Sequence, residues 1–350
     1  MVERQIFPRE LAAHRVRVVD DVENPTRELH SVSGGSSAGG ASSAGAGDSV
    51  TGGAGAADAS GPLGTSPSLE RIRLGTSSWS APSWEGPFYP RGLPPARWLE
   101  HYATEFDSVE IDATFYRIPE ERTVDGWRDR TPPGFLFSAK VPQVVTHEKM
   151  LENCLEEMTA FLKVMQRLGD RLGPLLLQFR YFRKAELPDP KPFLERLERF
   201  LPSLPPTMRF AVEVRNRAFL GDRLFDLLRR QEIALAFIDH PWFPGVGEMM
   251  KRRAARTAPF SYIRWLGDRV EIEKRTTTWD ALIVDRRAEM RRWAEAVRTL
   301  QREERTVHGY FNNHYAGYGV GSIRLFRDIL DESAGNSEPP ARSPGPGVEV

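Results

Sequence analysis

The sequence predicts an α/β protein whose centre is a single (β/α)₈ TIM-type barrel, with disordered N-terminal and C-terminal segments. Short apolar runs alternate with longer segments of helical period eight times along the chain. Several runs are apolar at nearly every position, as expected for parallel strands that are covered on both faces. The segment that contains them is about 260 residues long, which is the usual size of such a domain.

We interpret the eight apolar runs as strands. In chain order they begin at Ile72 (IRLGT), Ser108 (SVEID), Phe135 (FLFSAK), Pro174 (PLLLQF), Arg209 (RFAVEV), Ile233 (IALAFID), Ser261 (SYIRWL) and Val307 (VHGYFN). Strands that alternate with helices imply parallel βαβ units with right-handed crossovers. Eight such units favour a closed barrel over an open sheet.

Two of the intervening segments have the clearest helical period. Apolar residues recur at steps of three and four within residues 151–168 and again within residues 279–300, which predicts amphipathic helices there. Residues 239–260 differ, because two prolines and a glycine leave little room for a regular helix.

The flanks of the barrel segment differ from it in composition. From Ser33 to Ser60 almost every residue is small or polar, so we predict that residues 33–69 form a disordered linker. Residues 1–32 contain scattered apolar residues, which leaves open a small docking element or a disordered tail. We assign residues 70–332 to the barrel and residues 333–350 to a disordered tail.

Composition limits the classes of function. The chain has 48 basic and 48 acidic residues, so its net charge of zero gives no overall field to attract nucleic acid or an anionic membrane. The single cysteine, Cys154, excludes an intramolecular disulfide and lies at helical spacing among apolar residues, as a buried side chain would. The N-terminus lacks a secretory signal, and no apolar run reaches the ~20 residues of a membrane span. We therefore expect a cytoplasmic protein.

Polar residues follow each apolar run at the end where (β/α)₈ enzymes hold their active sites. They are Thr76 and Ser77, Glu110 and Asp112, Lys140, Gln178, Glu213 and Arg215, Asp239 and His240, Arg264, and Asn312 and Asn313. Strand alternation places Glu110 and Asp112 on one face of the second strand, opposite bulky apolar residues that suit the helix layer. In the sixth strand, the pattern leaves open whether Asp239 or His240 faces inward.

Four carboxylates and three cations that converge in one barrel mouth should perturb each other's pKa values. Such perturbation is typical of sites for proton transfer or for anionic substrates. The alternative is a charged layer that only fills the mouth. In addition, a loop rich in aromatics, which includes Trp79, Trp84, Phe88 and Tyr89, follows the first strand. It forms either one wall of a pocket or a loop packed by its own side chains.

No organic cofactor motif is evident in the sequence. The carboxylates could supply hard oxygen ligands to a divalent metal, with nitrogen from a nearby histidine; the histidines considered are His147, His240 and His314. However, HxxH and HExxH spacings do not occur, and three cations share the same mouth. We therefore assign no residue as a metal ligand and keep a divalent metal as an alternative.

The segments LGTSSW, FYP, FDSVEIDATFYRIP, FSAKVPQVVTHE, LGPLLLQF, FAVEVRN, YIRWLG and YFNNHYAGYG occur in this order. In these segments the chain resembles domain-of-unknown-function family 72, the YecE-like proteins, from about Ile72 to Ile329. The resemblance implies a (β/α)₈ barrel and singles out a set of site residues. They are Trp79, Glu110, Tyr116, Lys140, His147, Gln178, Glu213, Arg215, Asp239, Arg264, Asn312 and Asn313.

This chain departs from the family pattern in three places. Asp112 stands where many relatives have asparagine, and Phe219 stands where a tryptophan is common. Trp265 and Leu266 replace a more usual Leu-His pair, which removes a candidate base. The resemblance implies a fold and a site without implying a reaction.

The leading hypothesis is an enzyme that acts on a small polar or anionic substrate, sugar-like or phosphorylated, by acid/base chemistry. The reaction class, whether hydrolase, lyase or isomerase, stays open. The candidate catalytic residues are Glu110, Glu213, Lys140, His147 and Asp239. The candidate substrate-binding residues are Trp79, Asp112, Tyr116, Gln178, Arg215, Arg264, Asn312 and Asn313.

Two other classes of function remain as alternatives. One is a metal-dependent enzyme that processes nucleic acid, resembling the barrel endonucleases, with Lys251, Arg252 and Arg253 as a basic rim. The other is a ligand-binding protein without catalysis. The sequence does not predict an oligomeric state.

Overall fold

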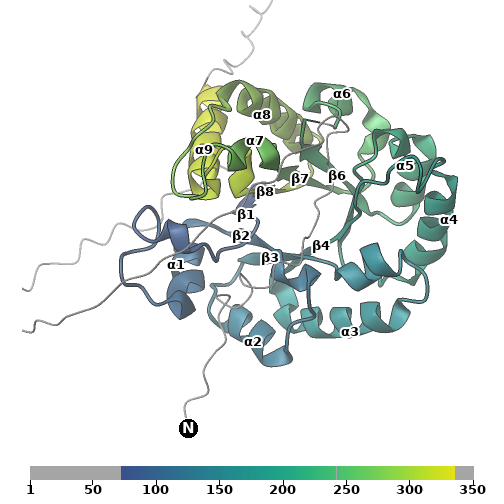
Figure 1. Cartoon of the computed structure of the whole chain (residues 1–350), viewed down its shortest axis with the longest axis horizontal. Helices are drawn as coiled ribbons and strands as arrows, with labels where there is room; N and C mark the ends of the chain where they lie inside the picture. The colour runs from purple at the N-terminus through teal and green to yellow at the C-terminus, as the bar shows by residue number, and fades with distance from the viewer. Residues whose placement is uncertain (1–71, 242, 336–350) are drawn as a thin grey trace, which may run out of the picture. The chain divides into compact units, whose positions relative to one another are not determined.

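Eight parallel strands form the centre of the computed structural model, which describes residues 72–241 and 243–335 (Figure 1). The strands are β1 (Ile72–Thr76), β2 (Ser108–Ile111), β3 (Leu136–Lys140), β4 (Leu172–Gln178), β5 (Phe210–Glu213), β6 (Ala234–Asp239), β7 (Phe260–Trp265) and β8 (Thr306–Phe311). Each overlaps one predicted run, so the predicted fold class is confirmed. The predictions for residues 1–32 and 33–69, and for the tail beyond residue 335, lie outside the described residues.

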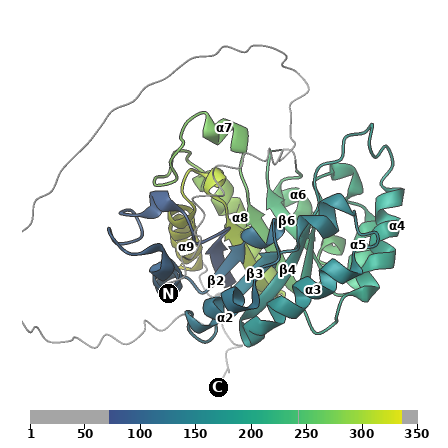
Figure 2. The same cartoon turned by 60° about the horizontal axis from the view of Figure 1, so that its bottom comes forward.

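Helices surround the strands on the outside of the barrel, except α7, which packs against the loop that follows β8 (Figures 1 and 2). They are α1 (Trp98–Glu105), α2 (Glu121–Asp129), α3 (Leu155–Met165), α4 (Lys191–Phe200), α5 (Asp222–Arg230), α6 (Val246–Lys251), α7 (Arg269–Glu273), α8 (Arg287–Arg302) and α9 (Gly319–Gly335). Within the described residues, none of them is long and apolar enough to cross a bilayer.

The barrel is nearly closed, and its seam lies between β1 and β2. Hydrogen-bonded neighbours run in the order β1-β8-β7-β6-β5-β4-β3-β2, while β1 and β2 share only an isolated bridge between Ser77 and Glu110. A tyrosine hydroxyl from α1 completes the seam: the Thr76 amide donates to the Tyr102 hydroxyl at 2.8 Å, which donates to the Ser108 carbonyl at 3.2 Å. A side chain therefore replaces part of a backbone ladder.

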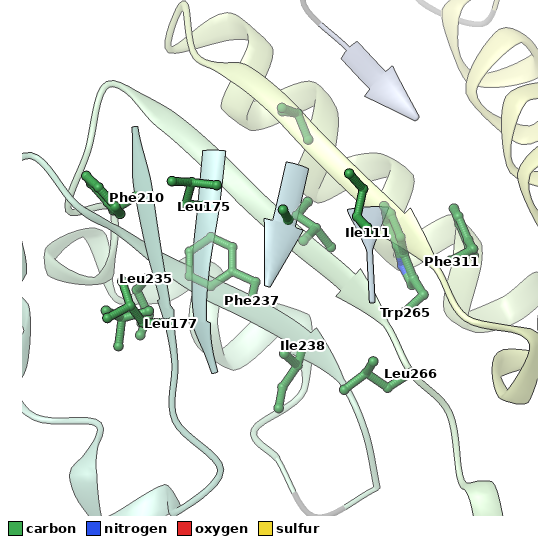
Figure 3. Close-up of a cluster of buried hydrophobic side chains, with 14 of the residues drawn as sticks. Ile111, Leu175, Leu177, Phe210, Leu235, Phe237, Ile238, Trp265, Leu266 and Phe311 are labelled. Carbon is green, nitrogen blue, oxygen red and sulfur yellow. The ribbon is translucent and has the colours of Figure 1, made fainter. Parts of the chain in front are cut away.

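Strand alternation divides the buried side chains between two cores. One face of each strand packs against the helices, and Figure 3 shows this face, with Trp265 stacked on Phe311 at a centroid separation of 4.1 Å. The other face fills the barrel interior with a smaller apolar set, which consists of Leu176, Ala211, Ala234, Ala236, Ala258, Phe260, Tyr262 and Tyr310. The interior also carries the buried polar residues described below.

Two helices are shorter than their apolar period predicted. Leu151 has a φ of 67°, a left-handed conformation that no helix contains, so α3 begins at Leu155. In the second case, Ile283 donates its backbone N–H to the Ala316 carbonyl at 2.7 Å, so this segment is a loop and α8 begins at Arg287. Leu151 packs in the core on the helix side of the strands, which explains the apolar period of the first segment. Between β6 and β7 the chain forms only the six-residue α6, as the prolines and glycine predicted.

Candidate functional site

Arg264, on β7, is the centre of a buried charged cluster at the C-terminal end of the barrel. Its side chain is 1% exposed, and its guanidinium donates to Glu110 Oε1 from Nη2 at 2.8 Å and to Glu213 Oε2 from Nη1 at 2.6 Å. Nη1 also donates to Gln178 Oε1 at 3.2 Å. Glu110 and Glu213 come from β2 and β5, which are not neighbours, so one arginine links distant walls of the barrel. We call these four residues the mouth cluster.

Two further side chains donate hydrogen bonds to Glu110. The Tyr262 hydroxyl donates to Glu110 Oε2 at 2.6 Å, and the Ser77 hydroxyl donates to Oε1 at 3.0 Å. Burial and the Glu110 charge raise the pKa of Tyr262 well above its usual value, so this hydroxyl remains a donor. The sequence analysis did not select Tyr262, although alternation along β7 places it on the same face as Arg264.

Glu213 is held in its charged form. Its carboxylate is fully buried, and Oε1 accepts from Arg215 Nε at 3.0 Å, while Oε2 accepts from Arg264. Burial alone would raise the pKa of Glu213, but the charges of Arg264 and Arg215 outweigh burial and lower the pKa to about 2. Arg264 and Arg215 together balance the charges of Glu110 and Glu213.

A second, partly exposed layer lies beside the mouth cluster. Lys140, at the end of β3, forms an ion pair with Asp112 at 3.0 Å, and their side chains are 14% and 31% exposed. β2 ends at Ile111, so Asp112 lies just past the strand, and its carboxylate is 4.0 Å from Arg264 Nη2. Burial and the charge of Glu110 raise the pKa of Asp112, against the opposing charges of Lys140 and Arg264.

Aromatic residues and a histidine border this pair. Lys140 Nζ lies 5.7 Å from the centre of the Phe115 ring, and the His147 ring meets the same phenyl ring edge to face at 4.9 Å. His147 belongs to a π-helical turn, Val144–Glu148, and its Nδ1 is 2.8 Å from the Thr146 hydroxyl. Tyr116 also contacts the Phe115 ring and is 52% exposed. The structure thus brings Asp112, Tyr116, Lys140 and His147 together.

Two predicted site residues lie on the helix side of the strands instead. Asp239 Oδ2 accepts from Trp293 Nε1 of α8 at 2.6 Å, and burial raises the pKa of Asp239. This contact resolves the open parity of the sixth strand, because the Asp239 carboxylate lies apart from Glu110 and Glu213. Trp79 packs edge to face against Trp127 of α2 and against Phe137.

The predicted asparagines build the loop that follows β8. Asn312 Oδ1 accepts from the His314 backbone N–H at 3.0 Å and lies 2.6 Å from His314 Nδ1. Asn313 Oδ1 accepts from the Gly319 amide at the start of α9, at 2.9 Å. His314 also pairs with Glu273 of α7, with Nε2 and Oε1 3.2 Å apart. The amide oxygens of Asn312 and Asn313 are therefore occupied by hydrogen bonds that stabilise the loop after β8.

The aromatic loop after β1 is packed by its own side chains. Trp84 and Tyr89 are 1% and 0% exposed, and Tyr89 stacks on Trp98 with an interplanar angle of 3°. Of the two interpretations left open by the sequence, this packing favours the structural one for these residues.

The geometry gives little support to the metal-binding and nucleic-acid alternatives. Across residues 72–241 and 243–335, no three His, Cys, Asp or Glu side chains gather as metal ligands, and Arg264 already lies between Glu110 and Glu213. The basic run at residues 251–253 follows α6, and the adjoining Ala254 carbonyl accepts from Arg229 near the end of α5. That place is the N-terminal end of the strands, so the run does not border the mouth.

Fold and site together define the class of this protein. It is a TIM-like (β/α)₈ barrel, a fold that often carries enzymes, with a charged cluster where barrel enzymes have their active sites. The family described as "Protein of unknown function DUF72" matches residues 73–345, and the chain belongs to this family.

Similar proteins agree with the family assignment. The chain is 35% identical over 151 residues to the UPF0759 protein YecE of Escherichia coli (strain K12), a match that covers 43% of this chain and 50% of that protein. The crystal structure of a DUF72 family protein from Thermotoga maritima MSB8 is 26% identical, with a TM-score of 0.59, and the match covers 76% of this chain and 99% of that chain. A family member from Enterococcus faecalis V583 has a TM-score of 0.57 at 21% identity, covering 74% and 95% of the two chains, and shows the fold alone.

Proposed function

We propose that the protein is an enzyme that acts on a small polar, anionic substrate, sugar-like or phosphorylated, by acid/base chemistry at the C-terminal end of its barrel. The observation that carries the proposal is the Asp112–Lys140 ion pair, which is partly exposed and lies beside the fully buried mouth cluster. Proton transfer to a bound substrate requires titratable groups that the substrate can reach. It is favoured when a rigid, buried charged cluster lies beneath those groups.

Burial divides the roles between the two layers. Glu110 and Glu213 are 0% exposed and accept charge-assisted hydrogen bonds, so in this proposal they position Arg264 and do not touch the substrate. Asp112 is the general acid or base, since it is partly exposed and burial raises its pKa above the usual value. His147 is a second candidate base, because its ring contacts the same Phe115 side chain as Lys140 does.

Two cations suit the anionic part of the substrate. Lys140 and Arg215 are both 14% exposed at the side chain and both contact a carboxylate of the site. A substrate phosphate or carboxylate placed between them would gain charge-assisted hydrogen bonds at low solvent exposure. Tyr116, half exposed beside Phe115, offers an aromatic face to a sugar-like ring.

The test combines binding with turnover. The melting temperature of the full chain is measured with a panel of sugar phosphates, small carboxylates and inorganic phosphate, for wild type, Lys140→Met and Lys163→Met. Lys163 is an exposed lysine of α3 and is the matched control. We expect at least one organic anion to stabilise wild type and Lys163→Met, with the stabilisation lost in Lys140→Met.

Stabilising compounds are then incubated with wild type and Asp112→Asn, and their conversion is followed by mass spectrometry. Turnover that is lost in Asp112→Asn supports the assigned role, whereas undiminished turnover removes Asp112 from the mechanism. A compound that binds through Lys140 and stays unchanged would instead favour the ligand-binding alternative.

A further inference from the structure

A second polar cluster lies at the opposite, N-terminal end of the barrel interior. His308 of β8 is fully buried, and its Cα partner in the register of β1 is Arg73. Arg209, directly before β5, and Arg73 both lie close enough to His308 to lower its pKa through their charges. We call His308, Arg73 and Arg209 the base cluster. The Tyr310 hydroxyl, hydrogen-bonded to Ser108 and Ser138 at 2.8 and 2.7 Å, lies one layer nearer the mouth.

His308 is without a hydrogen-bond partner among the described residues. Neither Nδ1 nor Nε2 has an acceptor or donor within reach, and the ring meets the edge of Phe260. A buried polar group that lacks a partner costs free energy, so native proteins pair nearly all such groups with protein, water or ions. The two ring nitrogens therefore indicate that something outside the described chain occupies this end of the interior.

The charges around His308 identify the chemistry of the occupant. Arg73 pairs with Asp107 at 2.9 Å, while Arg209 donates to the carbonyl of Leu172 at 3.3 Å. The charges of the two arginines repel each other, since burial and then Arg73 lower the pKa of Arg209. Asp107 is the carboxylate that takes part in these contacts. Its Oδ1 is buried and has no hydrogen-bond partner among the described residues. Arg73 and Arg209 thus bring two guanidinium groups to this end of the barrel, and in these contacts only Arg73 has a carboxylate partner.

We propose that the base cluster binds a small oxyanion of the class of inorganic phosphate. Guanidinium groups bind oxyanions through paired N–H donors, and a neutral imidazole adds one N–H donor. A protonated phosphate oxygen can in turn donate to an acceptor such as Asp107 Oδ1. The site is independent of the function proposed for the mouth, because it shares no residue with it.

The experiment follows the imidazole of His308 by NMR in the full chain at pH 7, as inorganic phosphate replaces chloride at constant ionic strength. The signal is assigned by its loss in His308→Gln. We expect a saturable shift of this signal in wild type, together with a rise in melting temperature that follows the same binding curve. Arg209→Met should weaken phosphate binding by roughly tenfold or more.

Two further variants make the result specific. Arg122→Met removes an arginine that is 75% exposed, pairs with Glu120 and should leave phosphate binding unchanged. Arg209→Lys keeps the charge but not the paired donors, so we expect intermediate affinity. A shift that does not saturate would mean that water alone fills the cluster, and a saturable shift that is the same in Arg209→Met would place the ion elsewhere. Either result overturns the proposal.

Discussion

At the C-terminal end of the barrel interior, Arg264 is buried between two carboxylates and hydrogen-bonds to both. At the N-terminal end, His308 is equally buried, but its ring nitrogens have no hydrogen-bond partner among the described residues, and the charges that act on it are those of Arg209 and Arg73. Both ends enclose ionisable side chains within one set of strands. They differ in whether the chain itself supplies the compensating charge.

This difference separates a self-contained site from an incomplete one. In the mouth cluster Arg264 binds both buried carboxylates, and Arg215 also donates to Glu213, so the geometry is fixed before any ligand arrives, which is what catalysis by preorganised charge requires. In the base cluster the compensating group has to come from solvent. Substitutions and changes of pH at the two ends test this contrast.

The largest effect is expected for Arg264→Met. Removing the guanidinium leaves Glu110 and Glu213 buried without their common partner, which should reduce the free energy of unfolding by about 3–5 kcal/mol. The matched change at the base, Arg209→Met, removes an arginine that reaches solvent and donates to the neutral Leu172 carbonyl, so the loss should be only about 1 kcal/mol. Urea unfolding of both variants compares them, and equal losses would show that the two ends do not differ.

A smaller effect is expected when a tyrosine loses its hydroxyl. Tyr262→Phe removes a hydrogen bond to the Glu110 carboxylate, and bonds to charged groups contribute about 1.5–3 kcal/mol. Tyr310→Phe removes bonds to two neutral serine hydroxyls, for which about 0.5–1.5 kcal/mol is expected. Chemical denaturation at pH 7 measures both losses. A greater loss for Tyr310→Phe would contradict the view that charge sets the strength of the mouth cluster.

The smallest effect concerns pH. Burial, with the charges of Arg209 and Arg73, lowers the pKa of His308 from 6.5 to about 3. The unfolded chain therefore binds a proton below pH 6.5 that the folded chain binds only near pH 3, so stability falls as pH decreases through this window. Between pH 6.5 and 5 the loss should be roughly 1.5 kcal/mol, and His308→Gln should remove it. The measurement is made in chloride, without phosphate.

The mouth cluster should respond in a different pH window. Because the pKa of Glu213 is lowered from 4.5 to about 2, its contribution to stability is complete above pH 4.5 and is lost as pH falls toward 2. Stability that fell between pH 6.5 and 5 to the same extent in wild type and His308→Gln would show that the histidine is not the group responsible.

The fold could be predicted because its signals are local and repeated. Nearly continuous apolar runs mark strands covered on both faces, and each of the eight strands overlaps one of them. The ends of helices were less predictable. Leu151 and Ile283 keep the apolar period of the following helices while their backbones form turns and loop contacts. Leu151 is buried in the core, and burial selects apolar residues whatever the local backbone conformation.

The candidate site was predictable where strand alternation decides which way a side chain points. It placed Glu110, Glu213 and Arg264 in one cluster, as the structure does. It could not decide between two adjacent polar residues, and Asp239 turned out to contact Trp293 of α8. A contact between residues 54 positions apart leaves no local signal in one sequence.

The base cluster was missed for a related reason. His308 lies in the middle of an apolar run, where alternation reads it as an interior position and nothing more. What distinguishes it is the lack of a partner, and a missing contact can be recognised only when the surroundings of the side chain are known. Tyr262 was missed because an aromatic residue in a strand is usually a packing residue.

The hydroxyl of Tyr102 at the β1–β2 seam has a consequence for the order of folding. Most neighbouring strands can pair as soon as both are formed, but the first and second strands are joined through a phenol that belongs to the helix between them. The contact through the phenol therefore forms only when α1 docks, whereas the bridge between Ser77 and Glu110 joins the two strands without the helix.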